Sequence, residues 1–278
     1  MVFDEKPVHL KFGIVPKHFY KLNEILCCLA GKWPYQRTST RFLINALTNI
    51  MLFLASIMQI IYLFETNFSI EELFQGIPVL VVLVLLFFIN ILFFVNANEA
   101  RVLWEIIADD WASERTIEET RIKESLARLS HLITKALTFS LGIGTVLFLM
   151  ASSFLSQIYD IIQPINGTHP LMLPFPVISL FDHEEYFLVS LIFQESTLIL
   201  SMISAMAGQT SLCIHILHLY GMFYVIGYRL ENAIPKSKLH NLSWIPCQEV
   251  DKDFRESIFL CIHRHRAAFK LVLLYRNL

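Results

Sequence analysis

The chain has 278 residues, of which 55% are hydrophobic and 17% are charged, and its mean hydropathy is +0.55. A soluble domain typically has about 25% charged residues, so this composition argues against a soluble protein. A net charge of −2, without a basic stripe of interleaved aromatic residues, gives no basis for nucleic-acid binding. The five cysteines are odd in number and lack metal-site spacing, which disfavours a disulfide framework.

Four apolar windows dominate the rest of the sequence. The first 41 residues are polar and mixed and do not form a signal peptide, and the first long apolar run begins at Phe42. A helix needs roughly 20 apolar residues to cross about 30 Å of hydrocarbon. Windows that long, free of Lys and Arg, cover residues 42–64, 73–98, 136–159 and 186–210. We therefore predict an all-α, polytopic membrane helical bundle with four spans rather than a soluble bundle.

The basic residues predict the orientation of the chain. Residues 1–41 hold seven Lys and Arg, residues 99–135 hold six and residues 229–278 hold nine, which together are all 22 in the sequence. The connections 65–72 and 160–185 hold none. Because short basic loops stay in the cytoplasm, we predict that both ends of this chain are cytoplasmic and that the long 160–185 connection is outside.

The predicted outer loop contains the stretch QPINGTHPLMLPFP, with four prolines and an Asn-Gly-Thr sequon at Asn166. On the outside of the cell, Asn166 would be an accessible acceptor for N-glycosylation. Prolines fix the local backbone and disfavour regular hydrogen bonding. We therefore expect this loop to be a shaped lid or lip rather than a helix.

The third and fourth spans are predicted to continue as helices past the membrane on the inner side. Residues 196–228 carry no formal charge, and a helix of that length would be about 50 Å long at about 1.5 Å per residue. The excess length leaves apolar surface in the cytoplasm, and such patches mark interaction sites. We predict a cytoplasmic segment 1–41, a four-helix transmembrane region 42–228 with inner helical extensions, and an assembly region 211–278 that makes an oligomer.

A carboxylate within the fourth window, Glu195, indicates a functional site. It lies about 15 Å into that window by helical rise, where a charged group is costly and by default faces a cavity or a partner. Polar residues of the third and fourth spans, with apolar residues of the second, can line a small-molecule cavity. The predicted ligand-binding residues are Val79, Leu83, Phe87, Ser152, Ser156, Tyr159, Tyr186, Ser190, Gln194, Glu195 and Thr197. For each residue taken singly, helix packing is the alternative.

The sequence gives no pattern that points to catalysis. His215 and His218 share one helical face, but no Cys, Asp or Glu accompanies them at ligand spacing, so a metal pair is disfavoured. We find no Ser/His/Asp set, phosphate-binding loop or HExxH helix. We therefore predict no enzyme activity, no metal site and no cofactor.

Three stretches of the sequence resemble the insect odorant receptor family. LAGKWPY at 29–35 is similar to the Gly-x-Trp-Pro element that precedes the first span of those receptors. HLYGMFYVIGYRLENA at 218–233 resembles their intracellular helix after the fourth span. FLCIHRHRAAFKL at 259–271 resembles their His-Arg segment toward the fifth span. The predicted inner N-terminus also matches the inverted topology of the family.

The resemblance implies an odorant-binding subunit of a tetrameric, odorant-gated, non-selective cation channel in the plasma membrane of sensory neurons. It implies a small volatile or lipophilic odorant as ligand, and a shared co-receptor subunit as partner within the lipid membrane. The odorant pocket would lie between helices in the outer half of the membrane, beneath the outer loop. The resemblance implies assembly through inner helices, for which we name His218, Tyr220, Tyr224, Arg229 and His263.

One departure from the family concerns the pore. The family has seven spans and its pore lies on the seventh helix, whereas four spans are predicted here. We therefore expect a C-terminally truncated chain, which is a fragment, an incomplete gene model or a truncated, non-conducting isoform. A gustatory receptor of the same superfamily is the nearest alternative. The distribution of basic residues disfavours a G-protein-coupled receptor, and the lack of an inverted repeat disfavours a transporter.

Overall fold

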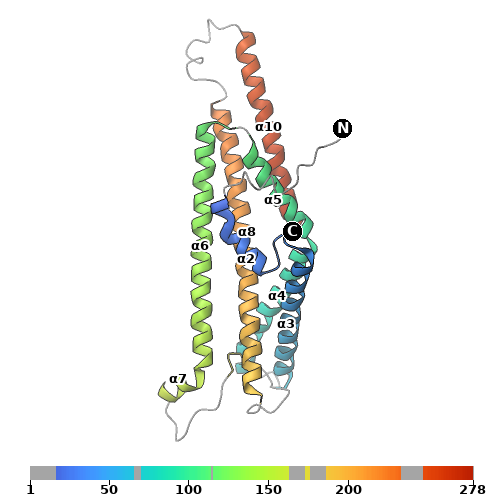
Figure 1. The fold of residues 1–278 in the computed structure, drawn as a ribbon, viewed down its shortest axis with the longest axis vertical. Helices are drawn as coiled ribbons and strands as arrows, with labels where there is room; N and C mark the ends of the chain where they lie inside the picture. The colour runs from blue at the N-terminus through green and yellow to red at the C-terminus, as the bar shows by residue number, and fades with distance from the viewer. Residues whose placement is uncertain are drawn as a thin grey trace. The chain divides into compact units, whose positions relative to one another are not determined.

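The computed structural model describes residues 17–65, 70–113, 115–162, 173–175, 186–232 and 247–277. Every regular element within these ranges is an α-helix (Figure 1). In chain order the helices are α2 (Lys17–Leu29), α3 (Thr38–Glu65), α4 (Ile70–Val95), α5 (Ala97–Ala112), α6 (Ile117–Ser153), α7 (Leu155–Ile162), α8 (Phe187–Glu231) and α10 (Cys247–Asn277).

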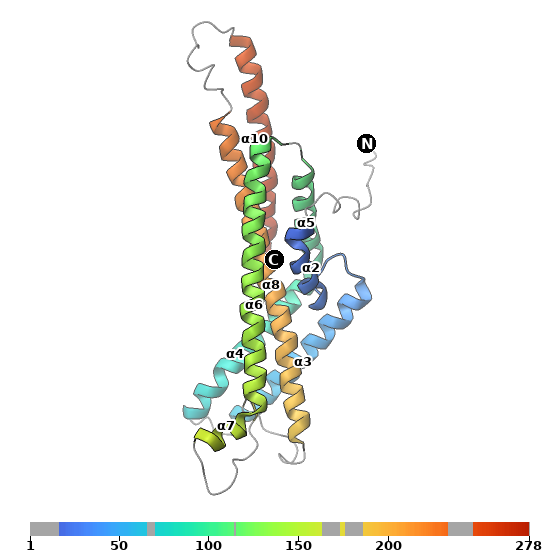
Figure 2. The ribbon, with the colours of Figure 1, turned by 60° about the vertical axis from the view of Figure 1, so that its left-hand side comes forward.

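Four of the described helices, α3, α4, α6 and α8, are long and apolar enough to cross a membrane. The prediction of an all-α bundle with four spans is therefore confirmed. Helix α6 has 37 residues and α8 has 45, and both run without interruption in the two views of Figures 1 and 2. At about 1.5 Å per residue α8 is about 68 Å long, more than twice the hydrocarbon thickness of about 30 Å. The predicted helical extension of the spans is thus present.

Two predicted windows run across helix ends. The 73–98 window passes from α4 into α5, and the 136–159 window passes from α6 into α7. At the second boundary the hydroxyls of Ser152 and Ser153 donate to the carbonyl of Leu149, at 2.9 and 2.8 Å. Such bonds to the preceding turn compete with the helical ladder and often bend a helix. Average hydropathy gives no sign of this break, so the predicted window 136–159 includes residues of both helices.

Helix α2 is an element that the polar composition of the first 41 residues did not reveal. Its buried positions are Phe19, Tyr20, Asn23, Leu26 and Cys27, and they recur at spacings of three and four. That spacing is typical of a helix with one packed face. The amphipathic pattern was therefore the signal available in the sequence.

The chain divides into two compact units, which we describe separately. Unit 1 comprises Met1–Leu22, Asn98–Thr134 and Thr210–Leu278. Unit 2 comprises Asn23–Ala97 and Lys135–Gln209. Helices α6 and α8 contribute one part of their length to each unit, whereas α3 and α4 belong to unit 2 and α5 and α10 to unit 1.

A buried cluster in unit 1 joins α5, α8 and α10. It is formed by Leu103, Met222 and Ala268, each at most 4% exposed. Ile106 and Leu219 pack against this cluster. Residues from three helices far apart in the sequence thus share one core.

In unit 2, the segment after α2 is fixed by polar contacts to three helices. Gly31 has a φ of 66°, a left-handed conformation that glycine adopts without strain. Its carbonyl accepts a hydrogen bond from Asn45 Nδ2 at 2.5 Å. Next to it, Lys32 Nζ donates to the carbonyl of Ser204 at 2.9 Å and lies 4.4 Å from the centroid of the Phe93 ring. Gly31 and Lys32 of the LAGKWPY stretch therefore tie together α3, α4 and α8.

Candidate functional site

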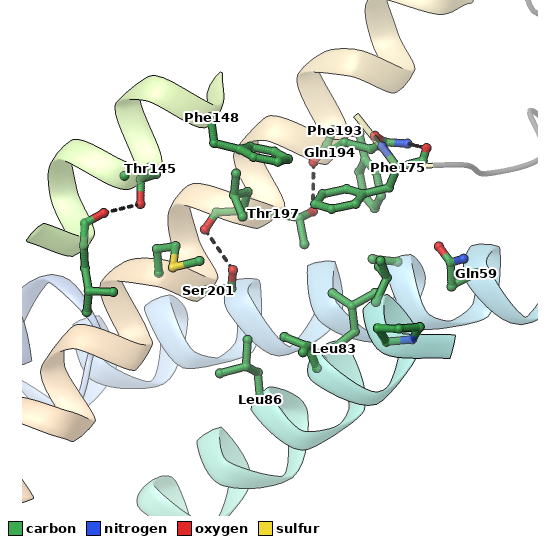
Figure 3. Close-up of a pocket in the computed structure, with 18 of the residues that line it drawn as sticks. Gln59, Leu83, Leu86, Thr145, Phe148, Phe175, Phe193, Gln194, Thr197 and Ser201 are labelled. Carbon is green, nitrogen blue, oxygen red and sulfur yellow. Dashed lines mark hydrogen bonds between the residues drawn. The ribbon is translucent and has the colours of Figure 1, made fainter. Parts of the chain in front are cut away.

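A cavity of about 510 Å³ lies within unit 2 between α3, α4, α6 and α8 (Figure 3). Its walls are mainly aliphatic and aromatic side chains with a few polar groups, which is the usual makeup of a small-molecule site. The lining residues are Ala55, Met58, Gln59, Pro78, Val79, Val82, Leu83, Leu86, Ser140, Leu141, Gly144, Thr145, Phe148, Phe175, Phe193, Gln194, Thr197, Leu198, Ser201 and Met202.

The hydroxyl groups in this lining donate to carbonyls of their own helices. The bonds are Ser140 to Leu137 O at 3.2 Å, and Thr145 to Leu141 O, Thr197 to Phe193 O and Ser201 to Leu198 O at 2.8 Å each. A hydroxyl that bonds to its own helix in this way satisfies its hydrogen without a cross-helix partner. The four hydroxyl hydrogens are therefore engaged, and the walls that carry them act as largely apolar surfaces.

Phe175, from the short described part of the predicted outer loop, forms one wall of the cavity (Figure 3). Its backbone N–H donates to Gln194 Oε1 at 3.1 Å, and its carbonyl accepts from Gln194 Nε2 at 3.2 Å. Its ring stacks on that of Phe148, with centroids 5.6 Å apart and an interplanar angle of 23°. The amide of Gln194 thus holds a loop residue against α6 and α8.

Gln59 of α3 is the other amide in the lining, and it is only 1% exposed. Its Nε2 has no hydrogen-bond partner among the described residues. The amide packs close to Gly76 of α4, because a Cβ atom at position 76 would lie 3.0 Å from Gln59 Nε2 and 2.7 Å from Leu63 Cδ2. A side chain at position 76 would therefore require the ends of Leu63 and Gln59 to shift.

Four of the predicted ligand-binding residues line the cavity, namely Val79, Leu83, Gln194 and Thr197. Glu195 is not among the lining residues. Its Oε1 lies 2.8 Å from Ser153 Oγ and 3.3 Å from Ser152 Oγ, so each hydroxyl shares its one hydrogen between this carboxylate and the carbonyl of Leu149. The carboxylate and the predicted residue Ser152 therefore join α6 to α8 beside the cavity.

The other predicted ligand-binding residues are placed elsewhere or are not described. Phe87 packs against the rings of Phe53 and Phe88, at centroid distances of 5.9 and 5.7 Å. Tyr186 is 38% exposed just before α8, and Ser190 lies in the first turn of that helix. Outside the described part of the chain lie the side chains of Ser156 and Tyr159, and the predicted glycosylation site Asn166.

Several lining residues were not predicted, above all Gln59, Phe148, Phe175 and Phe193. Gln59 carried a usable signal, because it is one of few amide side chains in an otherwise apolar first window. The phenylalanines carried none, since 23 residues of this type are spread over the chain. Which of them meet depends on helix packing that periodicity alone does not determine.

Unit 1 carries a buried network of charged residues. Asp110 of α5 forms an ion pair with Lys123 of α6, and its Oδ2 lies 3.0 Å from His218 Nε2 of α8. All three side chains are less than 10% exposed. The network thus links three helices through one carboxylate.

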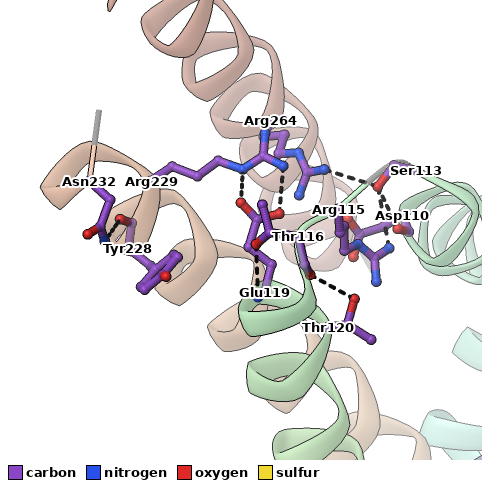
Figure 4. A network of polar contacts seen from close by, with 10 residues as sticks. All are labelled: Asp110, Ser113, Arg115, Thr116, Glu119, Thr120, Tyr228, Arg229, Asn232 and Arg264. Atoms are coloured by element: carbon purple, nitrogen blue, oxygen red, sulfur yellow. Dashed lines mark hydrogen bonds and ion pairs between the residues drawn. The ribbon is translucent and has the colours of Figure 1, made fainter. Parts of the chain in front are cut away.

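A second carboxylate of the same unit, Glu119, is held by Arg229 (Figure 4). Both carboxylate oxygens accept from the guanidinium, with Nη2 to Oε2 at 2.6 Å. Nearby, Ser113 Oγ accepts from Arg264 at 3.2 Å and from Arg115 at 3.3 Å. Burial and the charge of Arg264 lower the pKa of Arg115 to about 10. Cations from the end of α8, from α10 and from the α5–α6 connection therefore gather around one buried carboxylate.

The predicted assembly residues divide into two groups. His218 and Arg229 are engaged in the ion-pair network of unit 1. Tyr220 and Tyr224 are 54% and 51% exposed, and their ring centroids lie 6.1 Å apart on one face of α8. His263 of α10 is also exposed. The second group is thus available on the surface of this chain.

Comparison with known proteins identifies the family. A family model described as the 7tm odorant receptor matches residues 69–278. The insect olfactory receptor OR5 from Machilis hrabei, solved in complex with eugenol, has a similar fold, with a TM-score of 0.62 and 14% identity over 96% of this chain and 68% of that chain. No curated protein matches the sequence. The family model describes receptors and not enzymes, and because it covers well over half of the sequence, this chain belongs to the insect odorant receptor family.

Proposed function

We propose that this chain is the odorant-binding subunit of an odorant-gated cation channel, and that the cavity of unit 2 is its odorant site. The observation that carries the proposal is a space of about 510 Å³ with mainly apolar walls built by four helices. A small lipophilic molecule buries most of its surface in such a site. The complex of the Machilis hrabei receptor with eugenol supports a small organic ligand for this chain as well.

The proposal extends to location and partners. We infer a multi-pass protein of the sensory-neuron plasma membrane, with a cytoplasmic N-terminus and Asn166 on the outside, as the distribution of basic residues predicts. The co-receptor subunit docks on the assembly region 211–278. The exposed pair Tyr220 and Tyr224 supports this surface, because tyrosine is enriched at protein interfaces.

Two glycines of α6 give a matched test of the odorant site. A Cβ atom at Gly142 or at Gly144 would meet nothing within 4 Å, yet only Gly144 lines the cavity. Gly144→Phe should therefore place a ring in the cavity from a Cβ that meets no neighbour, and Gly142→Phe should leave the cavity unchanged. We expect Gly144→Phe to weaken binding of the fluorescent apolar compound 1-aminoanthracene at least about tenfold, which corresponds to about 1.4 kcal/mol.

The measurement is a fluorescence titration of the purified chain in lipid nanodiscs, with wild type and both variants. Gly142→Phe should bind the compound with the wild-type dissociation constant. Equal binding by wild type and Gly144→Phe would show that the compound binds elsewhere. In that case the cavity would not be the odorant site.

A further inference from the structure

The amide of Gln59 differs from every other polar group in the cavity lining. It is 1% exposed, and its Nε2 has no hydrogen-bond partner in the described part of the chain. A buried donor without a partner costs about 1–3 kcal/mol. Because Gln59 lines the cavity, this unbonded donor indicates that a ligand supplies its hydrogen-bond acceptor.

The other polar groups of the lining are already engaged within the chain. Both functional ends of the Gln194 amide bond to the backbone of Phe175. The four lining hydroxyls donate to carbonyls one turn earlier in their own helices. None of the lining residues carries a formal charge. The lining therefore offers one uncommitted amide, that of Gln59 with its unbonded Nε2, and no counter-charge for an ionic ligand.

The side-chain torsion of Gln59, rather than open space around it, allows its amide to turn. Its Nε2 faces Gly76 of α4, a buried residue without a side chain, because a Cβ atom at position 76 would lie 3.0 Å from it. The terminal torsion of a glutamine has broad energy wells, so the amide can rotate its N–H toward the cavity when an acceptor is present. The apolar side chains of the lining offer it no acceptor.

We infer that the preferred ligands are neutral, mainly apolar molecules that carry one hydrogen-bond acceptor, such as an aryl ketone. Gln59 Nε2 donates a hydrogen bond to that acceptor. This inference rests on the proposed function of the cavity as the odorant site. Gln59 is then the residue that distinguishes an oxygenated odorant from a hydrocarbon of the same shape. Ionic ligands are excluded, because burying an unpaired charge costs far more than one hydrogen bond returns.

A pair of compounds of nearly equal shape tests the inference. Acetophenone has a carbonyl where α-methylstyrene has a CH₂ group, so only acetophenone offers an acceptor. Both compounds are titrated against 1-aminoanthracene bound to the purified chain in lipid nanodiscs. We expect wild type to prefer acetophenone about two- to tenfold, the range given by one neutral hydrogen bond.

Two variants assign the preference to a residue. Gln59→Met keeps the length of the side chain and removes the amide, and it should bind the two compounds equally. Gln194→Met is the control, because its amide holds Phe175 and not the ligand. Gln194→Met should weaken the binding of both compounds by the same factor, so that the preference for acetophenone is unchanged.

The outcomes separate this inference from the proposed function. If 1-aminoanthracene binding does not depend on Gly144, the cavity is not the odorant site and both proposals fail. If that binding depends on Gly144, equal displacement by the two compounds in wild type overturns the inference alone, as does the absence of displacement. A preference that persists in Gln59→Met also overturns it. The comparison in wild type remains decisive should Gln59→Met fail to fold.

Discussion

Units 1 and 2 stabilise their helices by opposite means. In unit 1, the carboxylates of Asp110 and Glu119 are buried and bind Lys123 and Arg229 of other segments. In unit 2, polar side chains bond mostly to backbone carbonyls, and even the cation of Lys32 is held by the carbonyl of Ser204. Unit 1 thus combines specific pairs of charges with its apolar cluster, whereas unit 2 relies on bonds to the backbone and on the fit of apolar helix faces.

The difference has a consequence for how each unit tolerates change. Removal of one partner from a buried ion pair leaves an uncompensated charge, so unit 1 is sensitive to single substitutions. Apolar walls accept changes of similar volume at a cost usually below about 1.5 kcal/mol. A cavity built of such walls, as in unit 2, can therefore change its ligand preference while the helices around it persist.

The largest effect is expected in unit 1. Glu119 is 2% exposed, whereas the neighbouring Glu118 is 53% exposed and pairs with Arg121 on the surface. Glu119→Gln should lower the free energy of unfolding by about 3–5 kcal/mol, because Arg229 loses its counter-charge. Glu118→Gln should change it by no more than about 1 kcal/mol. Denaturant unfolding of the purified chain measures both, and similar values for the two variants would refute the contrast between the units.

A smaller effect is expected where α3 and α4 pack in unit 2. Gly76→Ala places a Cβ atom 2.7 Å from Leu63 Cδ2, so the ends of flexible side chains must shift, and it should destabilise the chain by about 1 kcal/mol, the lower end of the cost of overpacking. Gly142→Ala meets nothing within 4 Å and should stabilise its helix by about 0.5–1 kcal/mol. Thermal unfolding measures the stability of both variants. We expect Gly76→Ala to unfold at a lower temperature than wild type and Gly142→Ala at a higher one. A neutral Gly76→Ala would mean that the fit of these helices is looser than the packing indicates.

The buried cation of unit 2 predicts a pH dependence. Burial lowers the pKa of Lys32 from 10.5 to about 8. Between these values the unfolded chain binds more protons than the folded chain, so the contribution of Lys32 to stability rises with pH. Relative to Lys32→Met, wild type should gain on the order of 1–2 kcal/mol between about pH 8 and pH 10. Lys21→Met, at an exposed position, should keep the wild-type dependence of unfolding free energy on pH. The same dependence in wild type, Lys32→Met and Lys21→Met would contradict this prediction.

The smallest effect on stability is expected at the surface of α8. Tyr220→Ala and Tyr224→Ala remove exposed rings and should change the free energy of unfolding by less than about 0.5 kcal/mol. Both variants should nevertheless reduce co-purification with the co-receptor subunit. Undiminished co-purification of the double variant would remove this pair from the assembly surface.

The fold was predictable to the extent that it follows from charge and length. Four windows without Lys or Arg predicted the four spans. The uncharged residues 196–228 predicted a helix longer than the membrane is thick. The break after Ser153 was not predictable from hydropathy, because it coincides with local side-chain hydrogen bonds. Helix α2 was missed because its signal is the spacing of buried residues and not its composition.

The site was predictable only in part, because it depends on contacts between helices. Val79, Leu83, Gln194 and Thr197 were named from their helices and do line the cavity, although ligand binding by them remains a prediction. Glu195 was expected to face a cavity or partner, and it bonds instead to Ser152 and Ser153 of α6. The polar residues of the fourth window thus indicated the segment of α8 that lines the cavity. Contacts with the neighbouring helices determine which of these polar groups already have a hydrogen-bond partner.

The most direct test of the odorant site is photo-crosslinking with an acetophenone that carries a diazirine group, followed by mass spectrometry of the labelled peptides. We predict label on cavity-lining segments of α3, α4, α6 and α8, reduced by excess acetophenone and absent in Gly144→Phe. Label confined to other segments, or unchanged in Gly144→Phe, would contradict the assignment of the cavity in unit 2 as the odorant site.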